Sequence, residues 1–101
     1  MDITITRPAV KWMKEELNVE SGDSVRFYVR YGGSPQLYPG FSMGIALDKP
    51  ERPAVKTEEE GLTFFVEDAD SWYLRAHNLH VSFSRKHNTI IFEYNESSDA
   101  E

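Results

Sequence analysis

Alternation of apolar and polar residues is the feature that most constrains the fold of this chain. Residues 25–31 place Val25, Phe27 and Val29 on one face, and residues 41–47 repeat the pattern. A period of two is typical of a strand with one buried face. Because only a short glycine-containing segment separates the two stretches, they are predicted to pair as an antiparallel hairpin.

An amphipathic helix is predicted ahead of these strands. Residues 2–6 alternate like a short strand, and Thr6 is placed to cap a helix that tolerates Pro8 in its first turn. The helix is expected to end at Leu17 or Asn18, and its apolar stripe is expected to pack on a sheet. The stripe consists of Ala9, Val10, Trp12, Met13 and Leu17.

The rest of the chain predicts four further strands and one short helical turn. The strands are expected at residues 54–57, 62–67, 78–84 and 89–94. Residues 68–74 begin with an aspartate that can cap a helix, so a helical turn is predicted there. The predicted class is α+β, with mostly antiparallel strands in two short sheets and the N-terminal amphipathic helix covering an apolar face.

A single domain is expected over residues 1–94. A chain of 101 residues is large enough for one modest core and too small for two. Residues 95–101, NESSDAE, are polar and acidic and have no apolar anchor. We therefore expect them to form a disordered acidic tail.

The charge and the hydropathy exclude several classes of partner. The chain has 17 acidic and 11 basic residues, a net charge of −6, which gives no electrostatic footprint for nucleic acid or an anionic membrane. No apolar run approaches the ~20 residues of a membrane-spanning helix, and the start lacks a signal-sequence pattern. A cytoplasmic protein with neither a nucleic-acid nor a membrane partner is expected.

Cysteine is absent from the sequence. This excludes disulfides, thiolate metal sites, cysteine nucleophiles and ligation of an iron–sulfur cluster by this chain alone. No cofactor is predicted.

A family resemblance is carried by the order of the segments ITIT, VRFYVRYGGS, FSMGIALDKP, LTFFVED and HNLHVSFS, with the capped helix after the first. This order resembles the HesB-like domain, the fold of the A-type iron–sulfur cluster carriers. The resemblance covers residues 1–93. It implies the two-sheet α+β fold expected above.

In the cluster carriers that the chain resembles, a glycine-rich loop holds one cysteine ligand and a C-terminal Cys-Gly-Cys segment supplies two more. Here Ser34 stands at the loop position, and NESSDAE replaces the C-terminal segment. A serine is a poor cluster ligand at neutral pH. The resemblance therefore implies the fold, in a cysteine-less branch, without the cluster chemistry.

The loop between the first two long strands is the candidate site for a partner or ligand. Its glycines permit close backbone approach, and its aromatic side chains can form an apolar surface suited to protein contact. A hairpin needs such glycines without any ligand, so an ordinary turn remains the alternative. The candidate residues are Gly32, Gly33, Ser34, Tyr38 and Phe41.

Three histidines suggest a metal site. His77 and His80 are three apart across a loop-to-strand junction, which does not place two imidazoles on one face, and His87 lies in a predicted turn. A weak iron or zinc site from His77 and His80, completed by carboxylates or across a dimer interface, is the alternative hypothesis. A Ser-His-Asp site through Ser34 lacks the nucleophile turn, so no enzyme activity is predicted.

The favoured hypothesis is a non-enzymatic module that binds an unknown protein partner. The resemblance implies iron–sulfur assembly proteins as candidate partners, and a homodimer stays open. Trp12 and Trp72 are interpreted as packing anchors, one in each helix.

Overall fold

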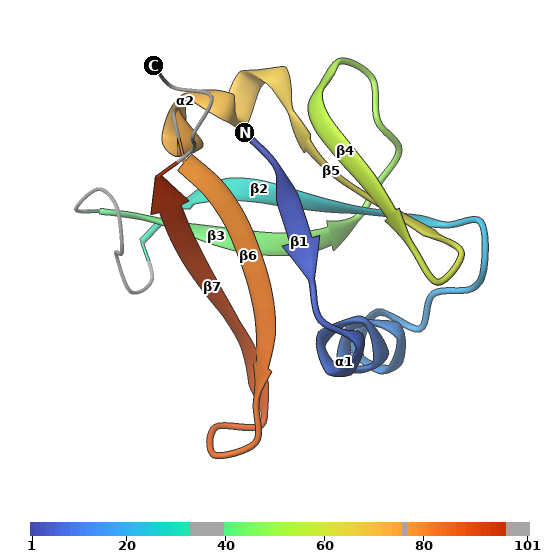
Figure 1. The fold of residues 1–101 in the computed structure, drawn as a ribbon. Helices are drawn as coiled ribbons and strands as arrows, with labels where there is room; N and C mark the ends of the chain where they lie inside the picture. Colours follow the sequence, from blue (N-terminus) through green and yellow to red (C-terminus); the bar gives the residue numbers. More distant parts are fainter. Residues whose placement is uncertain (33–39, 76, 97–101) are drawn as a thin grey trace.

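The computed structural model describes residues 1–32, 40–75 and 77–96 and contains two β-sheets that cross each other. Figure 1 shows β6 and β7 in front of β2 and β3, with α1 below β2 and β3 and beside the lower part of β6. The elements are β1 (Ile3–Ile5), α1 (Arg7–Leu17), β2 (Ser24–Tyr31), β3 (Phe41–Leu47), β4 (Pro53–Glu59), β5 (Leu62–Glu67), η1 (Asp68–Asp70), α2 (Ser71–Leu74), β6 (His77–Ser84) and β7 (Thr89–Glu96).

Each sheet combines one parallel pair with antiparallel hairpins. The three-stranded sheet has the order β1-β6-β7, with β1 parallel to β6, and the four-stranded sheet has the order β3-β2-β5-β4, with β2 parallel to β5. The β2–β3, β4–β5 and β6–β7 pairs are antiparallel. The α+β class with two short sheets is confirmed, and the parallel pairs are a feature that the sequence pattern did not indicate.

Helix α1 forms as the sequence predicts. The Thr6 hydroxyl accepts a hydrogen bond from the Ala9 amide at 3.4 Å, and the helix ends before Asn18, which has a left-handed φ of 54°. This cap satisfies one of the free amides of the first turn. Ala9, Val10 and Met13 are buried, and α1 packs against β6 and β7.

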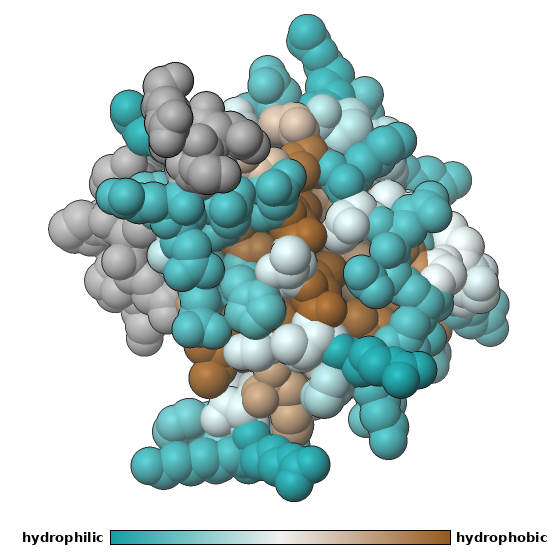
Figure 2. Space-filling model, in the orientation of Figure 1, coloured by the Kyte–Doolittle hydropathy of each residue, from teal (hydrophilic) through white to brown (hydrophobic). Residues whose placement is uncertain are grey.

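The two sheets share one apolar core. The Phe27 ring of β2 stacks on Phe64 of β5 with centroids 5.9 Å apart, and it meets Phe92 of β7 edge-on at 5.8 Å. Phe27 and Phe64 are fully buried. Figure 2 shows hydrophobic residues at the middle of the face seen in Figure 1, with hydrophilic residues around them. Packing of Phe27 therefore joins the two sheets in one core.

The C-terminal boundary differs from the expectation. Strand β7 continues past residue 94, because Asn95 pairs with Asn78 and Glu96 with His77. The remainder of the expected acidic tail, residues 97–101, lies outside the described residues. In the described part of the chain, the helices fall short of the length and hydropathy that a membrane-spanning helix needs.

Candidate functional site

The described ends of the glycine-containing loop are tied together by hydrogen bonds. The Gly32 amide donates to the Gly40 carbonyl at 2.7 Å, and the Ser42 hydroxyl donates to the Gly32 carbonyl at 2.8 Å. Gly32 and Gly40 have φ values of 99° and 88°, which favour glycine. The turn itself therefore explains these two glycines, without any ligand.

Of the four remaining loop candidates, one lies within the described residues. Phe41 is described and opens β3, directly opposite Tyr31 at the end of β2. Gly33, Ser34 and Tyr38 lie outside the described residues.

Three aromatic side chains form an apolar surface beside this loop, here called the aromatic surface: Tyr31, Phe41 and Trp72. The Tyr31 and Phe41 rings meet edge-on with centroids 5.7 Å apart, and the Phe41 and Trp72 rings meet edge-on at 5.4 Å. Tyr31 is 87% exposed and Trp72 is 43% exposed. Edge-to-face contacts of this kind add to the stability of an aromatic cluster beyond the area that it buries.

Two tyrosines support the aromatic surface from inside: Tyr73 is fully buried and Tyr94 is half-buried. Tyr73 lies edge-on to Trp72 at 5.7 Å, and its hydroxyl donates to the Phe41 carbonyl at 3.3 Å. Tyr73 also contacts Tyr94 of β7 at 5.9 Å. Burial, with Tyr73 beside it, raises the pKa of Tyr94, so its hydroxyl stays neutral. Phe41 and Trp72 are thus linked to the core through Tyr73, and Tyr31 contacts the Phe41 ring.

An ion pair fixes the helical turn that carries Trp72. The Arg26 guanidinium on β2 donates to the Asp70 carboxylate at 2.8 Å, and it lies 3.4 Å from Asp48. The hydrogen bond to Asp70 is the main cause that raises the pKa of Arg26. Because the Asp70 side chain is only 14% exposed, water screens this pair weakly. The turn is therefore held against β2 as well as against β3.

The exposure of Trp72 differs from the sequence interpretation. Trp12 is half-buried and packs against the core, as an anchor would. Trp72 packs on Phe41 and Tyr73 but leaves 43% of its surface exposed. Adjacent residues of a short helical turn point in different directions, so Trp72 and Tyr73 cannot both face the core. That adjacency is the sequence signal that one of the two aromatic residues is exposed, and the structure shows that it is the tryptophan.

The candidate metal ligands are not brought together. His77 Nδ1 donates to the Leu74 carbonyl at 2.9 Å, and His80 Nδ1 hydrogen-bonds the Thr4 hydroxyl at 2.6 Å. Both histidines belong to β6, and their separation of three places them on opposite faces of the strand. Within residues 1–32, 40–75 and 77–96, no group of three histidine, cysteine, aspartate or glutamate side chains could hold a metal ion. The metal hypothesis stays a prediction.

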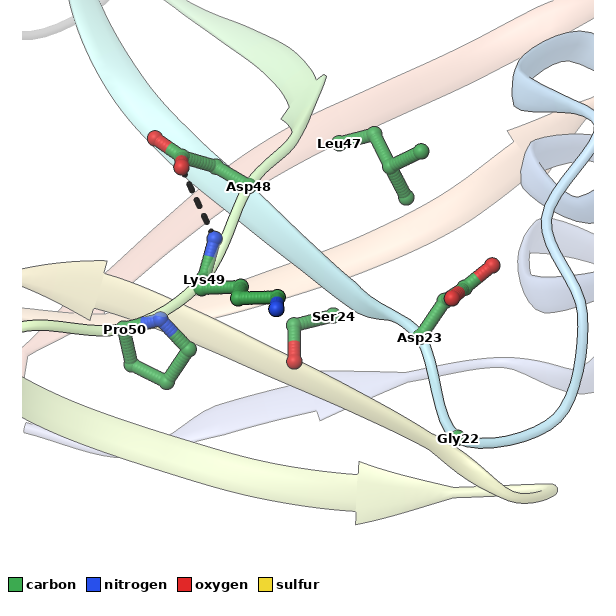
Figure 3. Close-up of a pocket in the computed structure, with 7 residues that line it drawn as sticks. All are labelled: Gly22, Asp23, Ser24, Leu47, Asp48, Lys49 and Pro50. Carbon is green, nitrogen blue, oxygen red and sulfur yellow. Dashed lines mark hydrogen bonds between the residues drawn. The ribbon is translucent and has the colours of Figure 1, made fainter.

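A hollow of about 640 Å³ lies at the opposite end of the β2–β3 hairpin, lined by residues 22–24 and 47–50. Figure 3 shows its side chains, including Asp48, whose carboxylate accepts a hydrogen bond from the Lys49 amide at 2.8 Å. The Asp23 carboxylate accepts one from the Glu20 amide at 2.8 Å. These carboxylates stabilise turns, and none of the predicted site residues lines the hollow.

Comparison with known proteins gives several relatives, although no family model matches the chain. The chain is 49% identical over 94 residues to the pyruvate dehydrogenase inhibitor of Bacillus subtilis, covering 93% of this chain and 99% of that protein. It is 42% identical over 84 residues to an uncharacterised protein of Staphylococcus saprophyticus, covering 80% of this chain and 86% of that protein.

A solved structure has a similar fold. Escherichia coli SufA, described as involved in the biosynthesis of iron–sulfur clusters, superposes with a TM-score of 0.60 over 95% of this chain and 86% of that chain. The sequence identity is 20%. A likeness at this identity shows the fold alone. It confirms the HesB-like fold that the order of sequence segments predicted.

Proposed function

Because this chain belongs to the family of the Bacillus subtilis pyruvate dehydrogenase inhibitor, we propose that it is a non-enzymatic cytoplasmic protein that binds and inhibits a pyruvate dehydrogenase. The observation that carries this proposal is the aromatic surface of Tyr31, Phe41 and Trp72. It lies beside the loop that the sequence singles out for partner binding.

The chemistry of the aromatic surface suits a protein partner. Tyrosine, tryptophan and phenylalanine are enriched at protein interfaces. Tyrosine and tryptophan are also among the commonest hot spots, the residues that contribute most of the binding free energy. Tyr31 is 87% exposed in the free chain, so a partner would bury an unusually large aromatic area there. Since the Trp72 ring already packs on Phe41 and on Tyr73, ordering that ring on binding costs little side-chain entropy.

Cluster transfer is not part of the proposed function. The chain has no cysteine, and iron–sulfur clusters require thiolates or, less often, imidazoles. Among the described residues, His77 and His80 point to opposite faces of β6. The name of the relative also favours pyruvate dehydrogenase over an iron–sulfur assembly protein as the partner.

An enzyme assay tests the proposal. We expect the purified chain, added to a purified pyruvate dehydrogenase complex, to lower the rate of pyruvate-dependent NADH formation until the rate reaches a plateau. Saturation is expected because each binding surface on the enzyme takes one chain. The inhibition should be the same with a chelator and with added iron or zinc, because no metal takes part.

The control is the chain unfolded by heat and returned to the assay at the same concentration. A full rate at every concentration of the native chain would overturn the proposal. Inhibition that disappears with the chelator would support the metal hypothesis instead.

A further inference from the structure

A second groove lies between α1 and the turn that joins β6 to β7, and it shares no residue with the aromatic surface. It has a volume of about 670 Å³. Three basic residues of α1 line it, Arg7, Lys11 and Lys14, and Arg85 of the turn completes the set. Positions 7, 11 and 14 are four and three apart, which places them on one face of the helix.

The charge of this groove is opposite to that of the whole chain. Four of the eleven basic residues line it, against two of the seventeen acidic residues, Glu15 and Glu60. The groove therefore carries two net positive charges in a chain of net charge −6. Such a local excess of positive charge attracts anions, because a concave surface focuses the electrostatic field of the charges that line it.

Of the four basic side chains that line the groove, two form ion pairs within it and two can bind a ligand. Glu60, at the β4–β5 turn, lies 3.9 Å from the Arg7 guanidinium and 3.7 Å from the Lys14 ammonium. Lys11 and Arg85 are exposed and have no ion-pair partner in the part of the chain that the structure describes. A ligand anion can therefore reach them without displacing a carboxylate.

Aromatic side chains supply an apolar wall to the same groove. Trp12 of α1 and Phe83 of β6 both line it and are half-buried, packed on one side against the core. A half-buried ring held by the core presents its remaining surface in a fixed orientation. Flat, electron-rich rings beside guanidinium and ammonium groups are the combination that holds a base or another planar group next to phosphates.

We propose that this groove binds a small phosphate-bearing ligand with a flat ring, of the nucleoside phosphate class. Lys11 and Arg85 hold the phosphates, and Trp12 and Phe83 contact the ring. A small molecule fits better than an acidic peptide, because the volume of about 670 Å³ lies within the range of small-molecule sites and three separate elements bound the groove.

The fluorescence of Trp12 provides the test. In a Trp72→Phe chain, Trp12 is the remaining tryptophan, since the sequence holds two. Titration with ATP is expected to change the fluorescence of Trp12 until the change saturates. Inorganic phosphate, which lacks the ring, and a polyglutamate peptide, which is an acidic polymer, are titrated in parallel. Calorimetric titration of the unchanged chain with ATP repeats the measurement without the substitution.

Matched variants give effects of opposite sign. Lys11→Ala with Arg85→Ala is expected to weaken ATP binding at least about tenfold, because charge-assisted hydrogen bonds are lost. Glu60→Gln is expected to tighten it about threefold, because the change removes a negative charge from the groove and releases Arg7 and Lys14 from their ion pairs without change of shape. Lys49→Ala with Lys56→Ala removes the same net charge outside the groove and should leave binding nearly unchanged.

Three outcomes would overturn the proposal. The first is the absence of saturable ATP binding by both fluorescence and calorimetry. The second is equal weakening by the groove variants and by the Lys49→Ala, Lys56→Ala control. The third is tighter binding of polyglutamate than of ATP, which would identify the groove as a surface for an acidic protein segment. None of these depends on whether the chain inhibits pyruvate dehydrogenase.

Discussion

Replacing Tyr31 and Trp72 together by serine is expected to abolish inhibition of pyruvate dehydrogenase at concentrations where the unchanged chain saturates the enzyme. Truncating an aromatic hot-spot residue costs about 2 kcal/mol or more of binding free energy, so each replacement is expected to weaken binding by about 30-fold. Both side chains are exposed, at 87% and 43%, so the core below them stays intact. The measurement is the concentration of chain that halves NADH formation.

The chain offers a matched control for this loss. Leu47 and Ile91 are also exposed apolar residues, at 53% and 37%, and neither belongs to the aromatic surface. Leu47→Ser with Ile91→Ser removes apolar area elsewhere and should inhibit like the unchanged chain. Equal loss in the two double variants would show that general surface hydrophobicity, rather than the aromatic surface, causes inhibition. Circular dichroism of each variant establishes that it is folded.

Phe27→Ala is expected to give the largest loss of stability. Its ring is fully buried and contacts Phe64 of its own sheet and Phe92 of the other sheet. Removing a buried phenylalanine ring costs about 3–5 kcal/mol, through lost burial and the cavity left behind. A domain of this size has only about 5–15 kcal/mol of stability, so the variant should lie close to unfolding.

Urea unfolding of Phe27→Ala and Phe27→Leu measures this effect. Leucine refills most of the volume, so it should cost less than about 2 kcal/mol. A loss below about 1 kcal/mol for Phe27→Ala would contradict a core shared by the two sheets. The comparison therefore tests the sheet packing directly, apart from any function.

Local patterns predicted the elements but not how distant strands pair. The alternation at Val25, Phe27 and Val29 predicted β2, and the Thr6 cap predicted the start of α1. The parallel pairs β1–β6 and β2–β5 join segments far apart in the chain, and periodicity carries no information about such pairing. The hairpins were predictable because a short turn leaves two strands few ways to pair.

The candidate site was also predictable only where its residues are close together in the sequence. Phe41 follows the glycine loop in sequence, so local reasoning found it. Trp72 joins it only because the helical turn after β5 packs against the start of β3, a contact between residues thirty-one positions apart. The groove between α1 and the β6–β7 turn was missed because Lys11 and Arg85, which both line it, come from opposite ends of the chain.

Hydrogen–deuterium exchange of the chain with and without the purified pyruvate dehydrogenase complex tests the proposed contact most directly. The expected result is slower exchange on binding at the end of β2, the start of β3 and α2, the three segments that carry Tyr31, Phe41 and Trp72, with α1 and the β4–β5 turn unchanged. Protection confined to other segments, or exchange that the enzyme leaves unaltered at saturating concentration, would contradict binding through the aromatic surface.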